Sequence, residues 1–284
     1  MKRSVYILFV LLAGVIGAVL RGLSITKGLE WNTGLPVRGD LSSLLLKILC
    51  VVVVVLAIVL SRRCYAQQGQ QYEAILGTLP SAARWICMLF GVGVVAVGVG
   101  ALICTNRIVL EQTSEYQPFG IPALIATLVQ WALCIISGVL LVGFAKRQDG
   151  REATKAQGLR AAVPMLWACL MLIMAYHENS GNPVMTDYAY ELLLAIAILA
   201  SFYAIACLFF AEPSARRVAL FCGLAVFLTI TAVGGLLLAA IMDATMLSLT
   251  LTSPTADLLR MAAYLMAGVY LLVQLTAIPV KIEE

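Results

Sequence analysis

The chain has 284 residues, of which 62% are hydrophobic and only 12% are charged, with a formal net charge of +4. Charged residues make up about a quarter of a water-soluble globular domain, so this composition excludes that class. The apolar residues come in blocks of about 18 to 25, and a helix of that length crosses a ~30 Å hydrocarbon core. Together with the mean hydropathy of +0.99, these blocks predict a polytopic helical membrane protein.

Eight membrane spans are predicted along the chain. They cover residues 4–20, 41–60, 82–104, 119–145, 161–176, 188–211, 218–242 and 257–277. The fifth span is the shortest, with only 16 residues, and it contains Pro164. A transmembrane barrel is excluded, because barrel strands are ~10-residue segments of alternating polarity. The predicted fold class is therefore all-α, a transmembrane bundle of about eight spans in a single integral membrane domain, residues 1–284.

The distribution of Lys and Arg predicts that both termini are cytoplasmic. Thirteen of these residues fall on the side of the termini and five on the opposite side, with Lys47 inside the second span. Cytoplasmic loops retain Lys and Arg, so the richer side is placed inside. The first span has the charged start and apolar run of a signal peptide but no convincing A-x-A cleavage site, so we expect a retained helix. The basic inner loop near residues 146–158 divides the spans four and four, which suggests two parallel halves.

The sequence lacks the motifs of the common enzyme classes. With His177 as the only histidine, the chain cannot form an H-E-x-x-H zinc site or paired haem ligands by itself. No G-x-S-x-G, P-loop or dinucleotide fingerprint is present. Seven of the eight cysteines lie in or at the ends of spans, only Cys64 lies in a loop, and buried cysteine acts as a small hydrophobe. We expect no catalytic activity, metal or cofactor, and the positive charge of the inner loops gives no reason to expect nucleic-acid binding.

Small residues mark the predicted helix contacts. The segment 91–100, GVGVVAVGVG, is especially rich in glycine. Small-xxx-small spacing lets helix backbones approach closely in lipid, and it occurs at Ala13 and Gly17, Ala96 and Gly100, Gly235 and Ala239, and Ala263 and Ala267. We favour packing within the bundle over a dedicated face for a homo-oligomer or a membrane protein partner, with the lipid bilayer around it.

One stretch, YHENSGNPVMTDYAYE at 176–191, gathers polar residues between two apolar spans. Its Ser-Gly and Asn-Pro pairs are turn signals, Asp187 could cap the sixth helix, and Glu191 in the first turn suits the helix dipole. The polar and aromatic groups of this stretch nevertheless exceed what a short turn needs: His177, Glu178, Asn179, Asn182, Asp187, Tyr188, Tyr190 and Glu191. The candidate polar cluster, or ligand entrance, comprises Lys47, His177, Glu178, Asn179, Asn182, Tyr188, Tyr190, Glu191, Asp257 and Arg260.

The sharpest structural hypothesis within this set is a charge network near the outer face. Glu191 is predicted a few ångströms inside the interface, where an ionised carboxylate is uncommon without a partner. Lys47 lies about six residues into span two, roughly 9 Å at the helical rise, and Asp257 and Arg260 begin span eight. Structural pairing of the four is favoured. The alternatives are that Lys47 snorkels outward while the carboxylates act as helix caps, or that the cluster binds a ligand or ion.

The patterns E-N-x-x-N-P-V at Glu178–Val184 and Y-x-Y-E-L-L at Tyr188–Leu193 resemble uncharacterised bacterial multi-span membrane proteins. This resemblance implies a bacterial plasma membrane and no known activity. Two functions then remain open. The first is a structural, sensory or assembly subunit, which the scarcity of charge at mid-depth favours slightly. The second is a protein that binds or transports a small solute, with the polar cluster as its extracytoplasmic entrance.

Overall fold

The computed structural model describes residues 3–30, 37, 39–65, 75–105, 107–108, 121–149, 155–179, 188–210, 213–243 and 254–278. Eight helices account for most of these residues: α1 (Arg3–Lys27), α2 (Leu41–Cys64), α4 (Ser81–Ile103), α6 (Ile121–Lys146), α7 (Lys155–Asn179), α8 (Ala189–Phe210), α9 (Ala215–Met242) and α11 (Pro254–Ala277). Each of the eight is long and apolar enough to cross a membrane. The predicted fold class is confirmed, and the chain is a multi-pass integral membrane protein.

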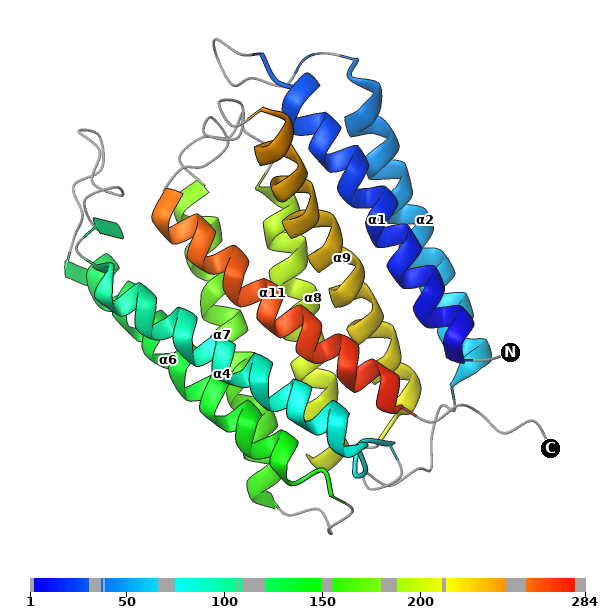
Figure 1. The fold of residues 1–284 in the computed structure, drawn as a ribbon, viewed down its shortest axis with the longest axis vertical. Helices are drawn as coiled ribbons and strands as arrows, with labels where there is room; N and C mark the ends of the chain where they lie inside the picture. Colours follow the sequence, from blue (N-terminus) through cyan, green and yellow to red (C-terminus); the bar gives the residue numbers. More distant parts are fainter. Residues whose placement is uncertain are drawn as a thin grey trace.

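The helices lie side by side and alternate in direction along the chain (Figure 1). α1 begins and α11 ends at one end of the bundle, which we call the proximal end, and the opposite end is the distal end. The positive-inside rule predicts that the proximal end faces the cytoplasm. The distal end then holds the starts of α2, α6, α8 and α11.

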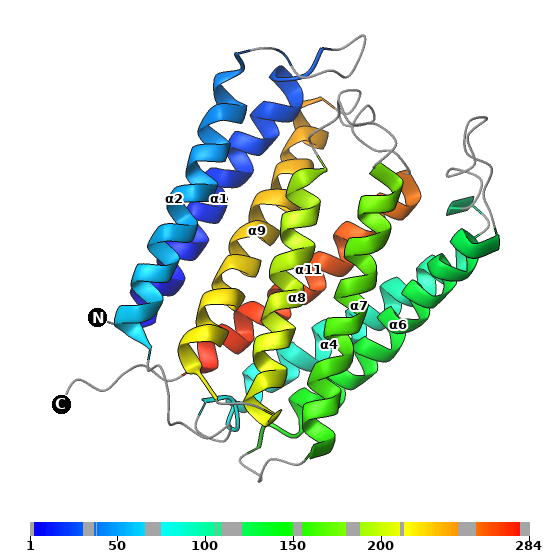
Figure 2. The ribbon, with the colours of Figure 1, turned by 180° about the vertical axis from the view of Figure 1, so that it is seen from behind.

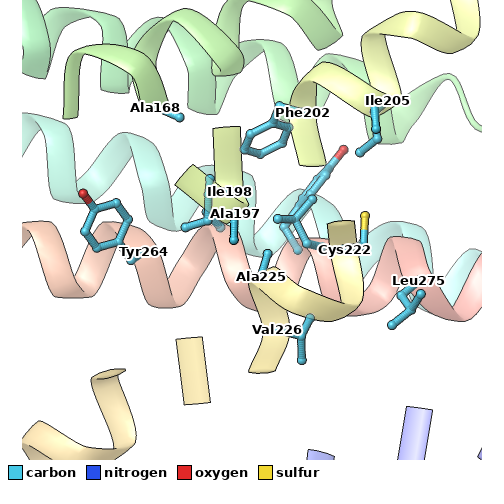
Figure 3. Packing of buried hydrophobic residues seen from close by; sticks show 14 of the residues in the cluster. Ala168, Ala197, Ile198, Phe202, Ile205, Cys222, Ala225, Val226, Tyr264 and Leu275 are labelled. Carbon is cyan, nitrogen blue, oxygen red and sulfur yellow. The ribbon is translucent and has the colours of Figure 1, made fainter. Parts of the chain in front are cut away.

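Five helices close a ring, in which α4, α6, α7, α8 and α11 each pack against the next and α11 returns to α4. α9 lies outside the ring against α8 and α11, α1 packs along α9, and α2 lies at the edge of the bundle (Figure 2). Small side chains such as Ala197, Ala225 and Cys222 fill the contact between α8 and α9 (Figure 3). At the edge, α2 buries only a narrow stripe, and most of its valines face outward, where lipid can cover them.

Several helices extend beyond the predicted spans, and α1 and α7 do so the most. α1 continues from the predicted end at residue 20 through Lys27, and α7 covers Lys155–Asn179 instead of 161–176, with Pro164 in its interior. The prediction counted apolar residues, whereas helical hydrogen bonding continues through the polar turns beyond the hydrocarbon core. The same reason corrects the position of Cys64, which is the last residue of α2 and is buried rather than in a loop.

Glycines set the closest helix approaches. A Cβ added at Gly17 of α1 would lie 2.4 Å from Oγ1 of Thr231 on α9. Between α6 and α4, a Cβ at Gly138 would lie 2.7 Å from the carbonyl oxygen of Gly91. Spacings this short require glycine. By contrast, a Cβ at Gly100 would meet nothing within 4 Å, so this member of a predicted contact pair is not used inside the described bundle.

The connection from α1 to α2 at the distal end is held by side-chain hydrogen bonds. Asp40 caps α2 by accepting from the amides of Ser42 and Ser43, and the hydroxyls of Ser24 and Ser43 lie 2.6 Å apart across the two helices. Partial burial by itself would raise the pKa of the Asp40 carboxyl, but hydrogen bonds from the side chains and amides of Ser43 and Ser42 outweigh it and lower the pKa. The carboxylate therefore favours the folded start of α2.

Candidate functional site

Three charged side chains meet at the distal ends of α8 and α11. Arg260 Nε lies 3.0 Å from Glu191 Oε1, which joins α11 to α8, and Arg260 also pairs with Asp257 one turn earlier on α11. The exposed fraction is 1% for Arg260 and 5% for each of the two carboxylate residues. We call Glu191, Asp257 and Arg260 the distal ion cluster. It is enclosed by protein, and it cannot be solvated like an ordinary surface ion pair.

The positions of these residues in their helices explain the cluster. α8 and α11 both begin at the distal end, and Glu191 and Asp257 each stand in a first turn, where the helix dipole favours a carboxylate. Two buried carboxylates repel one another, so they need a shared cation. Arg260 is three residues after Asp257, a spacing that puts both side chains on one face of α11. A planar guanidinium with several donors can serve both carboxylates at once.

Lys47 does not join the distal ion cluster, and in this respect the four-residue network is wrong. Lys47 is exposed on α2, which packs against α1 and α9 rather than α8 or α11. No described carboxylate lies within ion-pair distance of it. The network was predicted from depth along the spans, and depth alone does not say which helices are neighbours. An exposed lysine on a membrane helix can extend its ammonium toward the interface.

The other candidates from the polar stretch separate into three groups. His177 is exposed at the end of α7, and Glu178 and Asn179 also belong to that helix, although their side chains are not described. Asn182, like Asp187, lies outside the described residues. Tyr188 is half-buried just before α8, and its carbonyl accepts from the amide of Leu192 at 3.1 Å. Of this stretch, Tyr190 and Glu191 are the residues that the structure brings to the distal ion cluster or its neighbourhood.

Arg21 is a buried cation, although it lies just beyond the predicted first span, residues 4–20. It lies within α1, is 2% exposed, and its Cζ is 4.5 Å from the centroid of the Tyr190 ring on α8. The side chain passes along α9 at Gly235, where an added Cβ would come within 2.7 Å of Arg21 Cβ. The absence of a side chain at Gly235 therefore gives Arg21 its route to a cation–π contact. Because Tyr190 directly precedes Glu191, this contact links α1 to the helix that carries the distal ion cluster.

A second polar group, also missed from the sequence, lies at the proximal end. Gln148, just after α6, and Gln274, near the end of α11, exchange side-chain hydrogen bonds of 2.9 and 3.0 Å. Gln148 also donates to the carbonyl of Leu76 at 2.9 Å, and Gln274 donates to Cys87 Sγ at 3.6 Å. Both glutamines are fully buried, and we call them the proximal amide pair. A glutamine inside an apolar span was the available signal, because a buried amide requires partners.

α11 is thus held by different chemistry at its two ends, by charge at the distal end and by neutral amides at the proximal end. Among the described residues, no group of three His, Cys, Asp or Glu side chains is placed to hold a metal ion. Comparison with protein-family models, curated proteins and solved structures found no match. Inferences about function therefore depend on the arrangement of the side chains.

Proposed function

We propose that the protein binds a small solute between its helices and exchanges it at the distal end, in the plasma membrane of a bacterium. The observation that carries this proposal is the pairing of buried Arg260 with carboxylates on two helices, α8 and α11. Ionisable groups inside a membrane are costly, and they commonly mark the pathways of solutes or ions. Stability alone does not favour keeping such a group, because apolar residues of similar volume often stabilise a fold as well as a buried ion pair does.

In this proposal the distal ion cluster acts as a clasp, a contact that holds two helices together over the entrance and must open for the solute to pass. It holds α8 to α11, which are neighbours in the five-helix ring, by ion pairs between side chains of the two helices. The proximal amide pair holds α11 to the loop after α6 and closes the opposite end. A site that is closed separately at its two ends can open to one side at a time, as alternating access requires. The location in a bacterial plasma membrane rests on the resemblance of residues 178–193.

The first test is native mass spectrometry of the protein released gently from its own membrane. A bound small molecule, reduced in the Glu191→Gln variant, is the expected result. A protein partner in fixed stoichiometry would instead support a structural or assembly subunit. Lipid as the only bound species would overturn the solute-binding proposal.

The clasp is tested by cysteine accessibility in a cysteine-free background. Ala263, one turn beyond Arg260 on α11, is fully buried, and we expect Ala263→Cys to react with an impermeant thiol reagent faster when Glu191→Gln is also present. Ala239→Cys is the matched control, because Ala239 is equally buried near the distal end but lies on α9 next to α1. Equal acceleration at both positions would indicate general loosening and would contradict a clasp.

The subunit function has one observation in its favour. Ala96 is exposed on α4, and Gly100 has open space beside it, so this small pair is free to receive another helix. Replacing Ala96 by Leu should remove a protein partner seen by native mass spectrometry, if the subunit function is correct. Loss of a small molecule on Glu191→Gln, with no change on Ala96→Leu, would favour solute binding.

A further inference from the structure

Two polar side chains at mid-depth between α6 and α7 have no hydrogen-bond partner among the described residues. They are Trp167, through its indole Nε1, and Ser137, through its hydroxyl. Both are fully buried by protein, unlike Trp85 of α4, which is 71% exposed on the outer surface of the bundle. A buried donor without a partner is costly, and most such groups in folded proteins bind another protein group, water or a ligand.

The contact of Gln130 with Met171 fixes the relative depth of these residues along α6 and α7. Gln130 Nε2 of α6 is 2.8 Å from the Met171 sulfur of α7, so the amide donor faces only a weak acceptor. Trp167 is one turn before Met171, and Ser137 is two turns after Gln130, about 6 and 10 Å along antiparallel helices. Trp167 therefore lies at a depth between Gln130 and Ser137, on the faces where α6 and α7 meet.

These residues stand near the middle of the bilayer. Trp167 is the middle residue of α7 (Lys155–Asn179), and Gln130 and Ser137 lie on either side of the middle of α6 (Ile121–Lys146). Both helices belong to the five-helix ring, which has the distal ion cluster at one end and the proximal amide pair at the other. Solute sites in transporters commonly lie at this depth, between helices.

The composition of the ring at this depth sets the class of ligand. Residues 85–103, 121–145, 161–176, 192–210 and 261–277 contain no Asp, Glu, Lys or Arg. A charged ligand would have no counter-ion there, and its transfer from water would be strongly unfavourable. An indole N–H can only donate, so the ligand must present an acceptor, while a hydroxyl can donate or accept.

We propose that the ring holds a small uncharged solute with oxygen acceptors, such as a polyol or an amide, which binds the Trp167 indole N–H and the Ser137 hydroxyl. This inference rests on the proposed function and assigns its site and ligand class. The Gln130 amide is the third group within reach of the same solute, because its present acceptor is only a thioether. The distal ion cluster then lies above the site as its closure, and it does not contact the ligand.

The test uses the full chain labelled with ¹⁵N-tryptophan in lipid nanodiscs. The chain has four tryptophans, so the indole N–H spectrum is simple, and Trp167→Phe identifies the signal of Trp167. The probes are glycerol and urea as uncharged solutes, and acetate and choline as charged ones. We expect the Trp167 signal to shift saturably with glycerol or urea only, while the signal of exposed Trp85 stays unchanged.

Two serine variants provide the matched comparison. Ser137→Ala should weaken the saturating response by about 5- to 10-fold, the value of one lost hydrogen bond. Ser201→Ala should leave it unchanged, because the buried Ser201 hydroxyl already donates to the Ala197 carbonyl of its own helix at 2.7 Å. Since Ser137→Ala removes a hydroxyl without a partner among the described residues, the variant is expected to fold.

Several results would overturn the inference. These are no saturable shift with either uncharged probe, an equal shift with acetate or choline, or equal effects of Ser137→Ala and Ser201→Ala. The proposed function is decided independently by mass spectrometry of the protein from its own membrane. A bound small molecule there, together with a Trp167 signal that does not respond, would keep solute binding and reject this site.

Discussion

Removing Arg260 should destabilise the protein more than removing either of its carboxylate partners. Arg260→Met leaves Glu191 and Asp257 close together and buried without their cation. Breaking a buried ion pair in this way costs about 3–5 kcal/mol. Glu191→Gln is milder, because Gln can still accept a hydrogen bond and Arg260 keeps Asp257. Exchanging a charge-assisted bond for a neutral one costs about 1–2 kcal/mol.

A variant in which all three charges of the distal ion cluster are removed distinguishes loss of charge pairing from loss of side-chain packing. The triple variant Arg260→Met, Glu191→Gln, Asp257→Asn carries no uncompensated charge, so it should recover at least half of the stability lost in Arg260→Met. Lys47→Met is the control, because Lys47 is exposed and outside the cluster, and it should change stability by less than about 0.5 kcal/mol.

The assay is reversible unfolding in mixed micelles, followed by circular dichroism as the denaturing detergent is increased. Each 1.4 kcal/mol corresponds to a tenfold change in the folded-to-unfolded ratio, so the expected differences are well resolved. The reasoning would be refuted if Arg260→Met cost no more than Lys47→Met. It would also be refuted if the triple variant were less stable than Arg260→Met alone.

Three further predictions concern other parts of the bundle. Asp40→Ala should lower the free energy of unfolding by about 1 kcal/mol at neutral pH, because the α2 cap is lost. Since the folded-state pKa of Asp40 is lowered, this difference should shrink as the pH falls through that pKa. Thermal unfolding curves of the two proteins should therefore converge in acid. Gly138→Ala should destabilise the fold by about 1–3 kcal/mol, because the added methyl group contacts the α4 backbone. Gly100→Ala should be neutral or stabilising. Equal unfolding midpoints of the two variants in the detergent titration would contradict this packing. Gln274→Leu should cost about 1–3 kcal/mol by leaving the Gln148 amide short of a partner, and adding Gln148→Leu should cost less than the two single changes together, as a double-mutant cycle will show.

The sequence was sufficient to predict the number and approximate position of the eight spans. Long apolar blocks require helices in lipid, and no packing detail is needed for that inference. The helix ends were less predictable, because hydropathy locates the hydrocarbon boundary and not the last hydrogen bond. For that reason α1 continued through Lys27, and Arg21 belonged to a helix and not to a connection.

Only part of the candidate site could be predicted from sequence patterns. The meeting of Glu191, Asp257 and Arg260 followed from depth and charge, since all three begin spans at the same predicted face. Lys47 lies outside the distal ion cluster because α2 packs against α1 and α9 and not against α8 or α11. The position of α1 depends on its close glycine contacts with α9. Gln148 and Trp167 could not be assigned to a site from the sequence, because a single polar residue in or beside an apolar span indicates the need for a partner but does not identify it.

α1 and its main packing partner, α9, are far apart in the sequence, and this separation has a consequence for synthesis and membrane insertion. α1 ends at Lys27 and α9 begins at Ala215, so the 187 residues between them are made before α9 begins to form. At about 5–20 residues per second, this delay is roughly 10–40 s. During that time α1 and α2 must remain in the bilayer as an independent hairpin, and the Arg21 guanidinium must extend to the lipid headgroups. The surface of α9 around Gly235 is then both a packing surface and the place where the charge of Arg21 becomes buried.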